Sequence, residues 1–397
     1  MKEIAIIGVG LTAGSITLEA LDAIKKADVP FGAPRLITAY QDSAKRAYSL
    51  YRPEDVAGIV ASDDAENFAV LVSGDVGFYS AAKGLCAVLS PYTVRLVPGI
   101  STVNAFFAKL QLPWQDAAFI SAHGRDTDIV STVRRNRLTF CLAGSNAGKL
   151  GGDLCNVGFS EIKVFIGENL GTPQARVLET RAEELADMGL SELTVLLFVN
   201  ESFDSTVPVG LPDSMFLREK GIPMTKSEIR AVSMSKLCIR PGSLCYDIGA
   251  GTGSVSVEMA LSAYKGSVYA VERREDAISL ISQNSREFHV SNIIPVQGEA
   301  PGAMKELPAP DVVFIGGSGG ELDEIIDAVL TKNPKARIVI TAVTLETVSA
   351  ALAALSAAGL DADIVQISAA RGRKVGRLHM MEAQNPVTII SAGGSQL

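Results

Sequence analysis

The chain has 397 residues, a net charge of −8, 20% charged residues and 47% hydrophobic residues. This length exceeds one typical hydrophobic core, so two or more domains are expected. The acidic balance, with no basic arm or stripe, argues against nucleic acid or a membrane as a partner. The N-terminus enters a strand pattern directly, without the apolar segment of a signal peptide, which predicts a cytoplasmic protein.

The five cysteines are scattered and form no C-x-x-C pair. This spacing predicts small buried side chains in a reducing compartment rather than disulfides or zinc ligands. The three histidines are too dispersed for a metal site, so no metal is expected. The sequence singles out no catalytic acid, base or nucleophile.

The first motif follows an apolar strand pattern at residues 3–9 and precedes a helix pattern at residues 16–26. It runs from Gly8 to Ala13 and fits the dinucleotide fingerprint G-x-G-x-x-A. An NAD-dependent oxidoreductase is therefore the alternative function. Against it, the second strand pattern lacks the acidic residue that normally binds the ribose.

Further apolar runs in residues 68–199 end in polar or glycine-rich loops. Among these loops are SGDVGFYS (73–80), VPGIST (97–102), SAHGRD (121–126) and GENLGTPQ (167–174). Their order resembles the tetrapyrrole methylase family, in particular its precorrin-6Y C5-methyltransferase branch. The chain departs from that family at its first loop, GVGLTAGS, which lacks the usual proline.

This resemblance covers roughly residues 1–200 and implies a tetrapyrrole methylase fold of two α/β subdomains that binds S-adenosylmethionine (SAM). The matching positions imply cofactor contacts from Gly74, Asp75, Gly77, Ser101 and Thr102. His123 and Arg125 follow a strand end and are expected to meet the tetrapyrrole; a structural polar loop is the competing interpretation.

A change of composition marks the domain boundary, because NESFDSTVPVGLPDS is rich in Ser, Asp and Pro. We expect one domain at residues 1–203, a linker at 204–213 and a second domain at 214–397. The second domain begins with a predicted helix whose N-cap is Thr225, with Glu228 completing a capping box. Its apolar residues face the core, and Arg230 is expected to lie away from it.

The central motif of the second domain is LCYDIGAGTGSVSVEM, residues 244–259. A strand, a glycine turn and a helix in this order place backbone N–H groups and a positive helix end around a ligand. The spacing Asp-x-Gly-x-Gly-x-Gly resembles the first motif of Rossmann-like SAM methyltransferases, and Ser254 stands where a dinucleotide site needs a third glycine. The expected cofactor contacts are Gly249, Ala250, Gly251, Thr252, Gly253 and, for the ribose hydroxyls, Glu272.

Strand and helix patterns then alternate to the end of the chain. The strands fall at 243–248, 267–272, 293–296, 311–315, 337–341, 363–367 and 387–391. They fit a parallel sheet with one reversed strand near its edge.

This half resembles the decarboxylating C15-methyltransferases through GIPMTKSEIR, DIGAGTGSVSVE, YAVER, QGEAP, FIGGSGG and ARGRKVGR. The resemblance adds Thr225 and Ala300 to the SAM site. Gly317 and Ser318, in a glycine loop that ends the fourth strand, are assigned to the substrate; a flexible turn is the alternative. Arg371 and Arg373 are assigned to substrate carboxylates, with a solvated hairpin face as the alternative.

Together the halves resemble the fused C5,15-methyltransferases of cobalamin biosynthesis. The fold class is then α/β, with a tetrapyrrole methylase domain followed by a Rossmann-like SAM methyltransferase sheet. The implied activity is methylation of a precorrin, or its cobalt-containing equivalent, at C5 and C15, with loss of the C12 acetate carboxyl group. The family also implies self-association. A third hypothesis, a binding or scaffolding protein with one decayed site, applies to the N-terminal half only.

Overall fold

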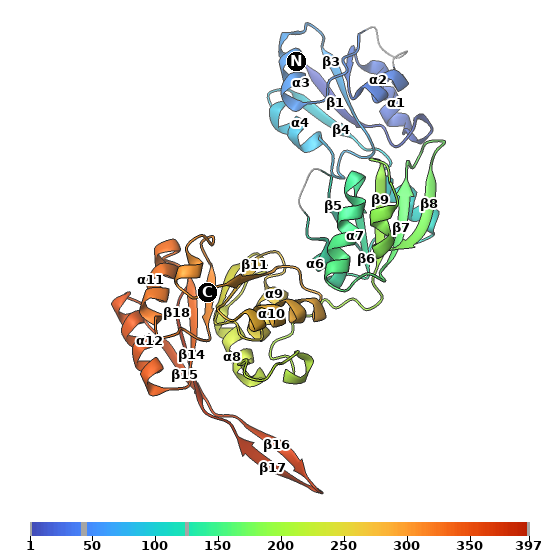
Figure 1. Ribbon diagram of the computed structural model, residues 1–397. Coiled ribbons are helices and arrows are strands. Elements are labelled where there is room, and N and C mark those ends of the chain that lie inside the picture. The colour runs from blue at the N-terminus through green and yellow to red at the C-terminus, as the bar shows by residue number, and fades with distance from the viewer. Residues whose placement is uncertain (1, 41–45, 124–126, 395–397) are drawn as a thin grey trace. The chain divides into compact units, whose positions relative to one another are not determined.

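The computed structural model describes residues 2–40, 46–123 and 127–394 (Figure 1). The chain divides into two compact units. The first comprises Met1–Thr127, Asn136–Gly152 and Glu161–Glu201, and the second comprises Asp128–Arg135, Asp153–Ser160 and Ser202–Leu397. No described helix is long and apolar enough to cross a membrane.

A four-stranded parallel sheet of order β2-β3-β1-β4 opens the chain. Three of its strands, β1, β2 and β3, come from buried apolar runs, as expected for parallel strands covered on both faces, whereas the edge strand β4 is mostly exposed. Helices α1 and α2 pack on one core and helices α3 and α4 on another. The strands are β1 (Glu3–Gly8), β2 (Val29–Phe31), β3 (Asn67–Val72) and β4 (Thr93–Val97).

A second sheet of order β5-β6-β9-β7-β8 follows in the N-terminal half. Only β5 and β6 pair in parallel; the other neighbours are antiparallel. Helix α5 packs its phenylalanines, Phe106 and Phe107, on this sheet. The strands are β5 (Ala117–Ser121), β6 (Leu138–Leu142), β7 (Lys163–Glu168), β8 (Arg176–Arg181) and β9 (Thr194–Val199). The two sheets confirm the α/β character expected for this half.

The second unit contains a seven-stranded sheet of order β12-β11-β10-β13-β14-β18-β15. The last strand along the chain, β18, lies antiparallel between β14 and β15. This confirms the predicted sheet with one reversed strand. The strands are β10 (Leu244–Ile248), β11 (Ser267–Glu272), β12 (Ile293–Gln297), β13 (Val312–Ile315), β14 (Arg337–Ala342), β15 (Asp363–Ile367) and β18 (Val387–Gly393).

Helices cover both faces of this sheet and form two separate cores (Figure 1). Helices α8, α9 and α10 contribute to one core, and α11 and α12 to the other. The helices of the chain are α1 (Leu18–Lys26), α2 (Pro34–Tyr40), α3 (Pro53–Ser62), α4 (Ala82–Val88), α5 (Thr102–Leu110), α6 (Ile129–Arg135), α7 (Ala147–Asn156), α8 (Ser227–Leu237), α9 (Ser254–Ser262), α10 (Glu275–Glu287), α11 (Leu322–Lys332) and α12 (Leu345–Ala357).

A two-stranded hairpin, β16 (Ala370–Val375) and β17 (Leu378–Ala383), lies between β15 and β18 and extends away from the sheet as an arm (Figure 1). Its residues are almost all exposed, including Leu378 at 75% and Met381 at 66%. The sequence did not predict these strands; the hairpin was only the alternative interpretation of the arginine-rich stretch.

Two expectations for helix α8 were wrong. The helix begins at Ser227 with Lys226 as its N-cap, and no side chain caps it. Asp213, a residue distant in sequence, accepts from the backbone N–H of Ser227 instead (3.0 Å), so Thr225 is not needed as a cap. Arg230 does not lie away from the core but is fully buried, because two carboxylates from other segments surround it.

Candidate cofactor and substrate sites

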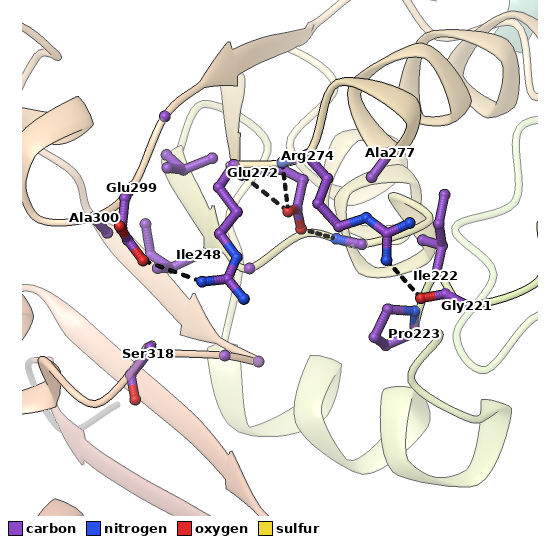
Figure 2. A pocket seen from close by; sticks show the side chains of 18 residues that line it. Gly221, Ile222, Pro223, Ile248, Glu272, Arg274, Ala277, Glu299, Ala300 and Ser318 are labelled. Atoms are coloured by element: carbon purple, nitrogen blue, oxygen red, sulfur yellow. Dashed lines mark hydrogen bonds and ion pairs between the residues drawn. The ribbon is translucent and has the colours of Figure 1, made fainter.

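A cavity of about 280 Å³ opens at the carboxyl ends of β10, β11, β12 and β13. In an open α/β sheet this edge is where ligands bind. Figure 2 shows its wall, which combines the glycine loop, the end of β11 and a segment from before helix α8. The cavity is lined by Gly221, Ile222, Pro223, Ile248, Gly249, Gly251, Val271, Glu272, Arg273, Arg274, Ala277, Gly298, Glu299, Ala300, Gly316, Gly317, Ser318 and Gly319.

The glycine loop requires glycine at both positions that face the cavity. Gly249 and Gly251 have φ of +73° and +54°, a left-handed conformation that is energetically unfavourable for any residue that carries a Cβ. A Cβ on Gly249 would lie 2.8 Å from the backbone N of Gly317, and one on Gly251 would lie 2.5 Å from the carbonyl oxygen of Pro223. The loop therefore packs backbone against backbone and leaves the cavity itself open.

Glu272 is half-buried at the end of β11 and points its carboxylate at backbone N–H groups (Figure 2). One oxygen accepts from the N–H of Gly251 (3.0 Å); the other accepts from those of Arg273 (2.9 Å) and Arg274 (3.1 Å). These bonds fix the carboxylate beside the glycine loop. A carboxylate has about four acceptor sites, so one remains for a ligand hydroxyl.

Two arginines after β11 brace the rim of the cavity. Arg274 donates to the carbonyl oxygen of Gly221 (2.7 Å), as Figure 2 shows, and also pairs with Asp276. Arg273 pairs with Glu299 on the opposite side (3.3 Å). The rim thus carries positively and negatively charged side chains and suits a ligand that bears a positive and a negative charge.

Asp247 lies under the glycine loop and is 1% exposed. Burial raises its pKa from 3.8 to about 7, opposed by the Ser256 hydroxyl that donates to Oδ2 and reinforced by the charge of Glu272. Its Oδ1 and the Thr252 hydroxyl are buried without a hydrogen-bond partner among the described residues. Unpaired buried polar atoms are costly, so their presence beside the loop fits a site that a polar ligand completes.

The cavity brings together half of the predicted site residues of the second domain. Gly249, Gly251, Glu272 and Ala300 line it, and so do both glycine-loop residues assigned to the substrate, Gly317 and Ser318. The other predicted cofactor residues do not line the cavity: Ala250, Thr252 and Gly253, which belong to the glycine loop, and Thr225, two residues after Pro223.

Sequence reasoning missed the wall formed by Ile222 and Pro223 and the two rim arginines. Their only signal was membership of the motifs GIPMTKSEIR and YAVERR, since nothing local shows that residue 223 folds back onto the glycine loop.

The structure does not bring Arg371 and Arg373 to the cavity. Arg371 makes a bidentate pair with Glu228 (2.9 and 2.8 Å) and contacts Asp213 (3.2 Å). Its guanidinium lowers the pKa of Glu228 to about 2. Arg373 pairs with Glu382 across the hairpin. Both arginines have carboxylate partners here, and their role toward substrate stays a prediction.

Three loops converge at the carboxyl edge of the first sheet. Gly8, Gly74 and Gly99 follow or end β1, β3 and β4, and their backbones touch: a Cβ on Gly99 would lie 2.3 Å from the carbonyl oxygen of Gly74 and 2.4 Å from that of Gly8. The side chain of Asp75 accepts from the N–H groups of Gly77 (2.8 Å) and Gly99 (3.0 Å). Asp75 therefore ties the second loop to the third.

Ser101 and Thr102 begin helix α5 beside these loops. The Ser101 hydroxyl caps the helix, accepting from the N–H of Asn104 (3.4 Å) and donating to its side chain (2.7 Å). The five predicted residues thus lie on adjoining loops at one edge, at a positive helix end. His123 is exposed and follows β5, and its Nδ1 lies 3.0 Å from the position that a Cβ on Gly144 would occupy. Arg125 lies outside the described residues.

Two N–H groups of the alternative dinucleotide loop already have an acceptor within the chain. The N–H groups of Leu11 and Thr12 both donate to the Ser15 hydroxyl (2.8 and 2.9 Å). Helix α1 starts only at Leu18, after a separate turn, so its N-terminus does not meet the loop. A pyrophosphate needs those N–H groups and that helix end.

Comparisons with known proteins match the two halves to two families. The sequence-family model of the tetrapyrrole (corrin/porphyrin) methylases matches residues 3–186. The model of the precorrin methyltransferase domain matches residues 215–393.

Individual relatives match one half or most of the chain. A probable cobalt-precorrin-6B C(15)-methyltransferase (decarboxylating) from Pyrobaculum calidifontis is 48% identical over 185 residues, 46% of this chain and 95% of that protein. A precorrin-6Y C(5,15)-methyltransferase (decarboxylating) from Sinorhizobium sp. is 29% identical over 327 residues, 80% of this chain and 78% of that protein. The crystal structure of a precorrin-6Y C5,15-methyltransferase from Geobacter metallireducens shares 39% identity and covers 47% of this chain and 97% of its own, with a TM-score of 0.45.

Proposed function

The chain belongs to the precorrin methyltransferase family, and we propose that it methylates a precorrin or cobalt-precorrin at C5 and C15 and decarboxylates its C12 acetate. The observation that carries this proposal is the match of two different methyltransferase models to successive halves of one chain. The relative that spans both halves has both activities in its name. The reaction belongs to the assembly of the corrin ring in cobalamin biosynthesis.

The residues around the cavity of the second domain fit SAM. The open glycine loop accepts a close approach, Glu272 keeps an acceptor for a ribose hydroxyl, and the unpaired Oδ1 of Asp247 beneath the loop leaves a polar atom that a ligand can complete. Gly249 and Gly251 would hold the cofactor, with Ala300 beside it. When bound, SAM supplies an electrophilic methyl group.

The protein's part in such a reaction is positioning. Aligning reactants and excluding water can supply roughly 7–11 kcal/mol of the barrier. The bridge carbons of a reduced tetrapyrrole are electron-rich, so they attack without a strong base from the protein. Loss of carbon dioxide needs an electron sink, which the conjugated ring provides. Both steps agree with a site built from glycines, carboxylates and arginines.

We assign C5 methylation to residues 1–203 and C15 methylation with decarboxylation to residues 214–397. In the first domain, Gly74, Asp75, Gly77, Ser101 and Thr102 would hold the cofactor. An Asp75→Ala variant should lose C5 methylation and keep C15 methylation. Mass spectrometry of the products from precorrin and cobalt-precorrin substrates tests the assignment. An Asp75→Ala enzyme that still methylates C5 at the wild-type rate would contradict it.

A dehydrogenase finds no comparable support, because two N–H groups of its candidate loop, those of Leu11 and Thr12, are already bonded to Ser15. Incubation with NAD or NADH and the precorrin should leave the nicotinamide absorbance unchanged.

Self-association is also part of the proposal. A two-stranded hairpin alone is marginally stable in water, and the arm exposes Leu378, Met380 and Met381. A second copy of the chain would cover them. Light scattering should show an oligomer that Leu378→Asp weakens; a monomeric wild-type protein would contradict this.

A further inference from the structure

Arg230 on helix α8 is a buried charge that the proposed reaction does not use. Its side chain is 0% exposed, and a lone charge in such a place is strongly unfavourable. Its Nε donates to Glu258 (2.8 Å) and its Nη1 to Asp213 (3.1 Å). Its terminal nitrogens also donate to the carbonyl oxygens of Thr225 and Leu211. The guanidinium therefore joins four separate points of the chain.

The two carboxylates are held in turn by the segment that leads into the domain. Glu258 accepts from the N–H groups of Gly210 and Leu211, both at 2.9 Å. Asp213 accepts from the N–H of Ser227, at the start of helix α8 (3.0 Å). The other oxygen of Asp213 lies 3.2 Å from Arg371, which offsets the second negative charge.

The segments joined by Arg230 form two walls of the cofactor cavity. Thr225 lies two residues from Pro223, which lines the cavity and accepts from the N–H of Thr252 in the glycine loop (3.3 Å). Glu258 lies on helix α9, which begins directly after that loop. Arg230 does not line the cavity itself. Arg230 thus links the 221–225 segment to helix α9 through the carbonyl oxygen of Thr225 and the carboxylate of Glu258.

Stability alone does not explain an arginine here. Well-packed apolar residues often replace a buried ion-pair network with no loss, or even a gain, in stability. What an apolar side chain cannot supply is a rigid planar fork with donors in several directions, and lysine cannot supply it either. The arrangement is suited to fixing the distances between the segments that Arg230 joins.

We propose that Arg230 is a positioning residue for the C15 methyl transfer: it holds the 221–225 segment against the glycine loop so that the cofactor cavity keeps its width. This inference rests on the proposed function of the second domain. It extends that function to a residue outside the cavity.

The test uses the full chain with Arg230→Lys and Arg230→Met, and with Arg240→Met as the matched control. Arg240 is exposed and remote from this network. For both Arg230 variants we expect the KM for SAM in C15 methylation to rise roughly ten- to a hundredfold. C5 methylation and the control should stay at wild-type values. An unchanged KM in either Arg230 variant overturns the proposal.

Hydrogen exchange supplies a readout that needs no precorrin substrate. In Arg230→Lys the backbone amide of Thr252, which donates to the carbonyl oxygen of Pro223 (3.3 Å), should exchange faster, while the amides of α11 and α12 keep their wild-type protection. Unchanged exchange at the Thr252 amide overturns the proposal, and so does a general loss of protection, which indicates a merely structural role. Should Arg230→Met fail to fold, Glu258→Gln replaces it with the same expectation for KM and exchange. A wild-type protein that binds no S-adenosylhomocysteine refutes the proposed function instead, whatever the exchange shows.

Discussion

The substitution Gly251→Ala tests the glycine loop most sharply. It adds one methyl group where the Cβ would lie 2.5 Å from the carbonyl oxygen of Pro223. Ordinary contacts begin near 3.4 Å, so the loop or the facing wall must move by roughly 1 Å. A displacement of that size in a binding site costs roughly a hundredfold in rate or affinity. The left-handed backbone at φ +54° adds about 1–2 kcal/mol of strain.

A matched control separates strain from contact. Gly359 has a φ of +71°, and a Cβ there would meet nothing within 4 Å. Gly359→Ala should therefore lose about 1–2 kcal/mol of stability and leave cofactor binding unchanged.

Calorimetry with S-adenosylhomocysteine provides the assay, together with separate C5 and C15 methylation rates. We expect Gly251→Ala to lose one of two binding events and C15 methylation while C5 methylation persists. If both binding events and both rates match those of Gly359→Ala, the glycine loop does not contact the cofactor and the reasoning is refuted.

Three further predictions follow from the same structure. Burial raises the pKa of Asp247 to about 7, so its contribution to the free energy of unfolding is complete below about pH 4 and is lost as the pH rises to 7. The loss amounts to roughly 4 kcal/mol and should be measurable by urea unfolding at several pH values. Asp247→Asn should remove this pH dependence, and an unchanged pH profile in the variant would contradict the prediction. Gly99→Ala places a Cβ against the carbonyl oxygens of two neighbouring loops, so it should abolish C5 methylation and spare C15 methylation; equal loss of both activities would be the wrong outcome. Burial raises the pKa values of the Cys141 and Cys245 thiols to about 12, so iodoacetamide should label exposed Cys238 first in the native protein; early labelling of Cys245 would show that its core is open.

The sequence was most informative where local pattern and burial coincide. Strands β10, β11, β13 and β14 of the large sheet were predicted because parallel strands buried on both faces read as unbroken apolar runs. The glycine loop was predicted because its conformation restricts residue type at Gly249 and Gly251. Glu272, predicted from the sequence as a cofactor contact, lines the cavity because β10 and β11 are neighbours in that sheet; its contact with the cofactor stays a prediction.

The sequence was least informative where the cause of a position lies far along the chain. Arg230 has the pattern of a solvent-facing helix residue, and only Glu258 and Asp213 make its burial tolerable. The start of helix α8 depends on the same Asp213. Arg371 was assigned to the substrate because its partner Glu228, 143 residues away, could not be seen from sequence.

The central claim is that one chain transfers methyl groups to two positions of one ring. Single-turnover reaction with methyl-13C-labelled SAM, followed by 13C NMR of the product, tests it directly. The account predicts labelled methyl carbons at both C5 and C15 and release of carbon dioxide from the same substrate. A product labelled at only one of these carbons, with the acetate carboxyl group retained, would contradict it.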